Sequence, residues 1–120
     1  MKLGFFTANF TEMPLESVME KIAPYGYEAL EIPAYEGNGQ LETADILKGN
    51  RAAEIKRAAK SYGMELCAVS NHADSFLIMG PSGKETDFIY KGLPEEKVRH
   101  GTESLIRTAQ AANVLEIPTV

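Results

Sequence analysis

The sequence has 120 residues, of which 44% are hydrophobic and 24% are charged, a balance typical of a folded globular domain and not of a disordered chain. The formal net charge is −5 and no basic tract is present, which disfavours binding to a nucleic-acid backbone. With Cys67 as its only cysteine, the sequence excludes an intrachain disulfide. No stretch reaches the roughly 18 apolar residues of a membrane span, so we expect a cytoplasmic protein that does not enter a membrane.

Short, largely apolar segments alternate with segments of helical period along the whole chain. Buried parallel strands are predicted over Leu3–Asn9, Tyr27–Pro33 and Leu66–His72, with a fourth beginning near Leu115. Three helices are predicted between them from apolar side chains spaced three and four residues apart. Their buried faces are expected to be Leu15, Val18, Met19 and Ile22 after Pro14; Ala52, Ile55, Ala59 and Tyr62 after a capping Asn50; and Val98, Thr102, Leu105, Ala109 and Ala112 in a helix opened by Pro94.

A helix–turn–strand unit occurs three times. Gly26, Gly63 and Asn113 hold the same place in it, where a helix commonly ends in a left-handed residue that glycine and asparagine tolerate. The resulting βαβαβαβ order predicts a parallel sheet with crossover helices. The unit therefore indicates either a doubly wound open sheet or a (β/α)₈ barrel.

Loop composition favours the barrel. The strand-to-helix loops Ala34–Gly49 and Ala73–Leu93 are long, as on the active-site rim of parallel α/β folds. A doubly wound fold usually has a glycine-rich phosphate turn after its first strand, whereas Thr7–Met13 contains no glycine. The sequence ends inside an apolar segment, so we expect residues 1–120 to be the N-terminal half of one TIM-barrel domain, interrupted in strand four.

Two candidate catalytic residues lie near the ends of predicted strands. His72 closes the third strand, and alternation puts it with Ala68 and Ser70 on the face that would line the barrel. Glu31 lies near the C-terminal end of the second strand between two apolar residues, and a carboxylate facing the barrel lumen is costly unless it is paired or binds a ligand. The alternative for His72 is a structural histidine that bonds only to loop backbone. The alternative for Glu31 is a structural ion pair.

Weaker candidates flank these two. Asn9 and Phe10 are suited to contact a polyol through an amide and a ring face, although loop packing explains them equally well. Asn71 neighbours His72, and Asp74 is expected either to orient His72 or to cap the loop. The Gly80–Thr86 segment lacks a phosphate-loop pattern and is expected to be an ordinary loop. Structural roles are also expected for Glu116 at the start of a strand, His100 in solvent and Cys67 in the core.

The sequence resembles the sugar phosphate isomerase/epimerase family, which has the xylose isomerase-like TIM barrel. The resemblance is carried by the opening from Lys2 to Thr7, by the segments Gly26–Ile32 and Gly63–His72, and by the third helix running into Ile117–Val120. It implies an enzyme that moves a proton beside a carbonyl of a sugar or sugar phosphate with a divalent ion (Mn²⁺, Zn²⁺ or Mg²⁺).

The resemblance also implies where the remaining chemistry lies. The metal ligands and principal base are expected beyond Val120, so Glu31 and His72 would be auxiliary or substrate-binding groups and the 120-residue chain alone would be inactive. Two alternatives stay open: a zinc phosphodiesterase similar to apurinic endonucleases, with His72 as a ligand, and a barrel that binds a sugar without turnover. The sequence leaves homo-oligomerisation undecided.

Overall fold

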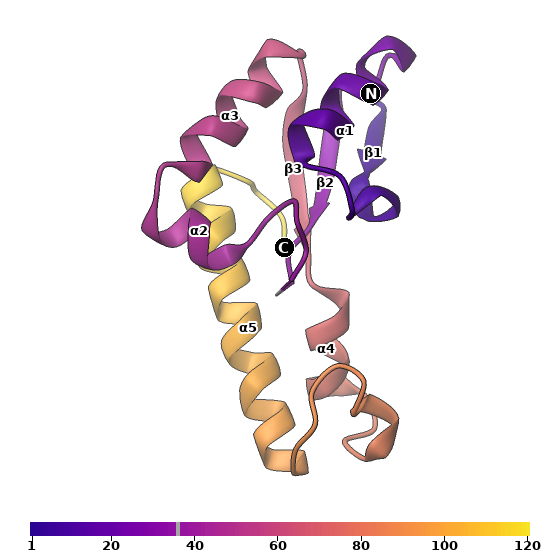
Figure 1. Cartoon of the computed structure of the whole chain (residues 1–120), viewed down its shortest axis with the longest axis vertical. Coiled ribbons are helices and arrows are strands. Elements are labelled where there is room, and N and C mark those ends of the chain that lie inside the picture. Colours follow the sequence, from indigo (N-terminus) through magenta and orange to yellow (C-terminus); the bar gives the residue numbers. More distant parts are fainter. Residues whose placement is uncertain (36) are drawn as a thin grey trace.

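Three parallel strands form a sheet in the sequential order β1 (Gly4–Phe6), β2 (Ala29–Pro33) and β3 (Glu65–Ser70). The computed structural model of the chain describes residues 1–35 and 37–120, and the fold is mixed α/β (Figure 1). Each observed strand is shorter than its predicted segment. The expected parallel sheet is confirmed, with β2 in the centre and one register irregularity at Leu30/Glu31.

Three helices cover one face of the sheet. They are α1 (Leu15–Ile22), α3 (Arg51–Ser61) and α5 (Pro94–Leu115). Their buried apolar side chains form one cluster with Leu30, Ile32 and Val69 of the strands. Burial of apolar surface is the dominant favourable contribution to folding. The predicted buried face of α1 is confirmed in full. That of α3 is confirmed except at Tyr62, which is 38% exposed.

Both long loops contain a helix that the sequence pattern did not predict. Helix α2 (Thr43–Lys48) lies in the loop predicted over Ala34–Gly49, of which Glu36 is outside the described residues. Helix α4 (His72–Met79) follows β3 almost at once. Together with the lower half of α5 it extends past the ends of the strands (Figure 1). Short 3₁₀ turns occupy Thr7–Phe10, Ala23–Tyr25 and Lys84–Thr86.

The buried face of α5 differs from the prediction. Val98, Thr102 and Ala109 are exposed, and Leu105 is half-buried. The buried positions are instead Lys97, Gly101, Ser104, Thr108, Ala111, Ala112 and Leu115. Only Ala112 is common to both sets, because polar and small residues occupy the face that packs on α4 and the sheet.

The third turn of the repeat also differs. Gly26 and Gly63 have positive φ values of 78° and 68°, as predicted, but α5 continues through Asn113 to Leu115 and Glu116 takes the left-handed conformation with φ 61°. The predicted strand from Leu115 does not form in the described chain. The segment after Glu116 nevertheless lies beside β3, since the Val69 N–H donates to the Thr119 carbonyl at 3.0 Å.

Candidate functional site

A hollow of about 450 Å³ lies at the carboxyl edge of the sheet, and we call it the strand-edge hollow. Its polar lining includes Glu31 from β2, Ser70 from the end of β3 and His72 from the start of α4. Leu105 of α5 and Thr119 complete part of its wall. The two predicted catalytic residues, 41 positions apart in the sequence, therefore line the same hollow.

The β2 strand presents Glu31 away from the helices. Its neighbours Leu30 and Ile32 are fully buried in the core cluster, whereas Glu31 is half-buried, as the period of a strand requires. The Glu31 backbone carbonyl accepts a hydrogen bond from Thr7 Oγ1 at 3.3 Å. Thr7 in turn donates to Gln40 Oε1 at 2.6 Å, so buried side chains from two loops support this end of β2.

His72 was predicted to close β3, but it is the first residue of α4. The reason is Asn71, which caps that helix by accepting a hydrogen bond from the Asp74 N–H at 3.2 Å. The His72 ring is exposed and lies edge-on to Phe6, with 6.1 Å between ring centroids. Ala68, Ser70 and His72 all line the hollow, so the predicted grouping of these three side chains is correct although the secondary structure of His72 is not.

Ser70 is a candidate site residue that the sequence did not predict. The residue is 9% exposed, and its Oγ is the buried side-chain polar atom that has no hydrogen-bond partner among the described residues. An unsatisfied buried hydroxyl costs about 1–3 kcal/mol. The signal in the sequence was the place of Ser70 two residues before His72, on the same predicted strand face. A serine in such a position is too common to be identified as a site residue from the sequence alone.

Asn71, which also lines the strand-edge hollow, forms a buried polar cluster with Asp74, which does not line it. The Asn71 amide group lies within hydrogen-bond distance of Ser104 Oγ (3.0 Å), Thr108 Oγ1 (3.1 Å) and Asp74 Oδ2 (3.2 Å). Ser104 Oγ also donates to Asp74 Oδ2. These bonds join α4 to α5, so Asp74 contributes to the cap of α4, and no bond from it to His72 is present in the described chain.

Asn9 and Phe10 lie outside this hollow. Both are in the 3₁₀ turn after β1, where Asn9 is exposed. The Phe10 ring packs on Phe5, with 5.9 Å between centroids, and Lys21 Nζ lies 5.7 Å from the same ring. The Phe10 ring thus packs against the core.

Cys67 and His100 differ from their predicted positions, because Cys67 is not part of the core cluster and His100 is not in solvent. Cys67 is half-buried and its Sγ donates to the Leu30 carbonyl at 3.1 Å. Burial raises the pKa of the Cys67 thiol, and the nearby Glu31 carboxylate adds to that rise. His100, expected in solvent, is instead half-buried and stacked on Tyr90 with 4.3 Å between ring centroids.

The Gly80–Thr86 segment, which lacks a phosphate-loop pattern, is anchored by a lysine. Lys97 is fully buried, and its Nζ donates to the Gly83 carbonyl, to Thr86 Oγ1 at 3.1 Å and to Asp87 Oδ1 at 2.6 Å. A buried ammonium group is tolerated only when its hydrogen bonds are satisfied in this way. The segment is therefore fixed to α5, and Lys97 is committed to that role.

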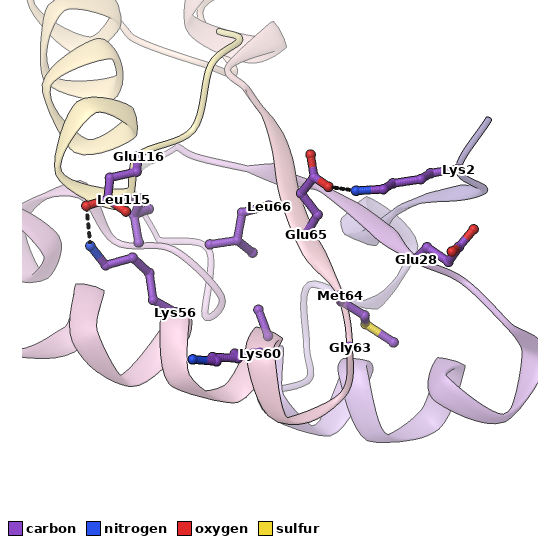
Figure 2. A pocket seen from close by; sticks show the side chains of 11 residues that line it. Lys2, Glu28, Lys56, Lys60, Gly63, Met64, Glu65, Leu66, Leu115 and Glu116 are labelled. Atoms are coloured by element: carbon purple, nitrogen blue, oxygen red, sulfur yellow. Dashed lines mark hydrogen bonds and ion pairs between the residues drawn. The ribbon is translucent and has the colours of Figure 1, made fainter.

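A second hollow lies at the opposite, amino edge of the sheet. Figure 2 shows Leu66 and Leu115 within it and an ion pair on either side, Lys2 with Glu65 and Lys56 with Glu116. The Lys56–Glu116 pair measures 3.3 Å. Active sites of parallel α/β folds lie at the carboxyl edge, and these rim charges neutralise each other, so the second hollow is a weaker candidate. The structural role predicted for Glu116 agrees with this placement.

The described residues contain no group of three or more His, Cys, Asp or Glu side chains placed to hold a metal ion. None of the helices in this part of the chain has the length and apolar character needed to cross a membrane. Comparison of the sequence with models of protein families gives no match, and comparison with curated proteins gives no match either.

Proposed function

We propose that the chain forms one part of a (β/α)₈ barrel that isomerises or epimerises a small sugar or sugar phosphate. The observation that carries the proposal is the strand-edge hollow, in which Glu31, His72 and the unpartnered hydroxyl of Ser70 face one space. A carboxylate, an imidazole and a hydroxyl are the groups that bind and orient a polyol.

The strand order supports a barrel. In a doubly wound sheet the order reverses at β1, which lies between two other strands. Here β2 lies between β1 and β3, and the segment that follows α5 bonds to β3 through Val69 and Thr119. This sequential arrangement, with the helices on one face and Glu31 and Ser70 on the other, is the one that a barrel requires.

The proposed roles follow from hydrogen-bonding capacity. The Glu31 carboxylate accepts hydrogen bonds from two adjacent substrate hydroxyls, while Ser70 Oγ donates to one oxygen and accepts from another. The His72 imidazole, exposed at the rim, holds or passes a proton at a substrate oxygen. The base that removes the proton from carbon is proposed to lie beyond Val120.

The family resemblance implies a divalent metal ion, and we include this ion in the proposal. Glu31 and His72 offer the carboxylate and imidazole donors that Mn²⁺ and Zn²⁺ accept, yet they are only two donors, so the chain fits a contributing wall and not a complete site. When bound, such an ion would polarise the substrate carbonyl or hydroxyl. The net charge of −5 makes the phosphodiesterase alternative the weaker one, because a nucleic-acid backbone selects basic surfaces.

The test is solvent proton exchange by the complete protein. The protein is incubated in D₂O with Mn²⁺ and a panel of ketoses and ketose phosphates, and deuterium on carbon is measured by NMR and mass spectrometry. We expect incorporation at the carbon beside the carbonyl for at least one substrate. Absence of incorporation across the panel, from a protein that is folded by circular dichroism, would contradict the proposal.

Two substitutions connect that activity to the hollow. Glu31→Gln and His72→Ala are each expected to lower kcat/KM by about tenfold or more, since each removes a polar contact to the reacting substrate. Glu103→Gln, an exposed change on α5, is the matched control and should leave kcat/KM unchanged. Equal kinetics in all three variants would place the active site elsewhere.

A further inference from the structure

A separate hollow of about 520 Å³ lies in the part of the molecule that extends past the strands, and we call it the aromatic hollow. Its walls include Tyr35, Phe88, Tyr90 and His100, and Asp74 contributes a carboxylate. It shares no lining residue with the strand-edge hollow. Three aromatic rings, an imidazole and an acid therefore meet around one space that the proposed function does not use.

The carboxylate is held in place from one side only. Asp74 is 6% exposed, and its Oδ2 accepts hydrogen bonds from Asn71 and Ser104. Its other oxygen, Oδ1, has no hydrogen-bond partner in the described part of the chain, and it is not among the fully buried unsatisfied atoms. Asp74 lines the aromatic hollow, and Oδ1 is the carboxylate oxygen that the bonds to Asn71 and Ser104 leave for a ligand.

Two contacts of α5 build the walls of this hollow. Gly101 lets α5 approach α4 closely, because a Cβ at this position would lie 2.7 Å from the Asp74 carbonyl. Lys97, one turn earlier, fixes the segment that carries Phe88 and Tyr90 through its bonds to Gly83, Thr86 and Asp87. Tyr90 then stacks on His100, with an angle of 19° between the two rings.

The charges around the aromatic hollow favour a cationic ligand. No cationic side chain forms an ion pair with Asp74 among the described residues, and the nearby Lys97 is already paired with Asp87. A buried carboxylate gains most from a charged donor, while the faces of tyrosine and phenylalanine rings attract cations. A neutral ligand could donate a hydrogen bond to Asp74, but it would lack the attraction of a cation to the carboxylate charge and to the ring faces.

We infer that the aromatic hollow binds a small organic cation, an ammonium, amidinium or guanidinium group attached to a planar or apolar body. The cationic group donates to Asp74 Oδ1 and the body lies between the rings of Tyr35, Phe88 and Tyr90. This inference does not depend on the proposed function, since it concerns different residues.

The test uses benzamidine as the cationic probe and benzamide as its neutral counterpart of the same shape. Both are titrated into the ¹⁵N-labelled chain, and amide shifts are followed by NMR. We expect benzamidine to shift the amides of Asp74, Phe88, Tyr90 and His100, and benzamide to bind at least about tenfold more weakly. Equal binding of the two probes, or no binding of benzamidine, would overturn the inference. Binding of methyl β-glucoside without benzamidine would replace the cation with a carbohydrate.

Three variants locate the binding. Asp74→Asn keeps the shape of the side chain and is expected to weaken benzamidine binding by about tenfold. Because Asp74 also bonds to Ser104 and its variant is at risk of unfolding, Phe88→Ala is the second test: its ring is 84% exposed, and its loss should weaken binding by about threefold. Phe76→Ala, an exposed change on α4 outside the hollow, should leave binding unchanged. An equal loss in Phe76→Ala and Phe88→Ala would overturn the assignment.

Discussion

The backbone N–H of Val69 in β3 donates to the backbone carbonyl of Thr119 at 3.0 Å. This bond places the segment after α5 against the side of β3 that β2 does not occupy. The segment is not a strand, yet it continues the sequential order of the sheet. The bond also covers one of the backbone groups that an edge strand would otherwise expose.

The first prediction concerns the exchange of that amide with solvent. Removal of Thr119 and Val120 takes away the acceptor and leaves Ile117, which is 6% exposed, in the core. We expect the Val69 amide to exchange at least about tenfold faster in the shortened chain. Leu30, in the central strand β2, is the internal control and should keep its rate. An unchanged Val69 rate would mean that the bond does not persist in solution.

A second prediction addresses the unpartnered hydroxyl of Ser70. Ser70→Ala removes a buried polar atom that has no partner, so the free energy of unfolding should rise by about 1 kcal/mol. If the hydroxyl is kept for a ligand, the same variant should raise KM for the substrate found by solvent exchange, because function and stability then oppose each other. Urea titration and steady-state kinetics measure the two effects.

The control for this prediction is Ser61→Ala. The Ser61 hydroxyl is exposed and already bonds to the Ala58 carbonyl at 2.7 Å, so its loss should neither stabilise the chain nor change KM. A Ser70→Ala chain that is less stable than the wild type would show that the Ser70 hydroxyl has a hydrogen-bond partner in solution, which would contradict this prediction.

The sequence predicted the parallel sheet and the core sides of α1 and α3 well, because these faces are apolar. It failed on α5 for a physical reason. Lys97, Gly101, Ser104 and Thr108 are buried, but none of them is a large apolar residue, so hydrophobic periodicity assigned the face to its neighbours. Burial of these residues depends on partners in α4 and the 83–87 segment, which no local pattern reveals.

The candidate site was predicted in part for a similar reason. Glu31 and His72 were found because the carboxyl ends of parallel strands meet at one edge, and both line the strand-edge hollow. Helix α4 was missed because its cap, Asn71, continues the strand pattern. Ser70 was missed because its distinguishing property, a hydroxyl without a partner, exists only in three dimensions.

A third prediction tests the buried lysine. Lys97→Met keeps an unbranched side chain that is one atom shorter, and it leaves Asp87, Thr86 and the Gly83 carbonyl without their donor. The free energy of unfolding should fall by about 2–3 kcal/mol, somewhat less than for a fully buried pair because the Asp87 side chain is 35% exposed. Lys91→Met, at an exposed position, should change stability by less than about 0.5 kcal/mol. Equal losses in the two variants would contradict the anchoring role of Lys97.

A fourth prediction concerns pH. The Arg51 guanidinium donates to Glu16 and holds the pKa of that carboxyl below its ordinary value of 4.5. A carboxyl whose pKa is lowered in the folded state stabilises the fold above pH 4.5, and this contribution is lost as the pH falls from 4.5 through the lowered pKa. Urea unfolding of Glu16→Gln at pH 6.5 should therefore show a deficit of about 1 kcal/mol or less, since the pair is partly solvated.

The pH dependence of the Glu16→Gln deficit is the control for the Glu16–Arg51 pair. The deficit of Glu16→Gln should shrink as the pH is lowered from 4.5 towards 2.5, because protonation removes the charge that glutamine also lacks. Glu20→Gln changes an exposed carboxyl on the same helix and should show no deficit that depends on pH in this way. A Glu16→Gln deficit that is constant over the range would mean that packing, and not charge, is lost.

A fifth prediction follows from the close approach of α4 and α5. In Gly101→Ala the new Cβ would lie 2.7 Å from the Asp74 carbonyl and 3.0 Å from Ile78 Cγ1, so the two helices must separate although alanine itself favours a helix. We expect the free energy of unfolding to fall by about 1–3 kcal/mol. Thr102→Ala, the neighbouring exposed change on α5, should be neutral or slightly stabilising. A stabilised Gly101→Ala chain would show that the helices are further apart in solution, and both the Asn71–Ser104 contact and the walls of the aromatic hollow would then need a different geometry.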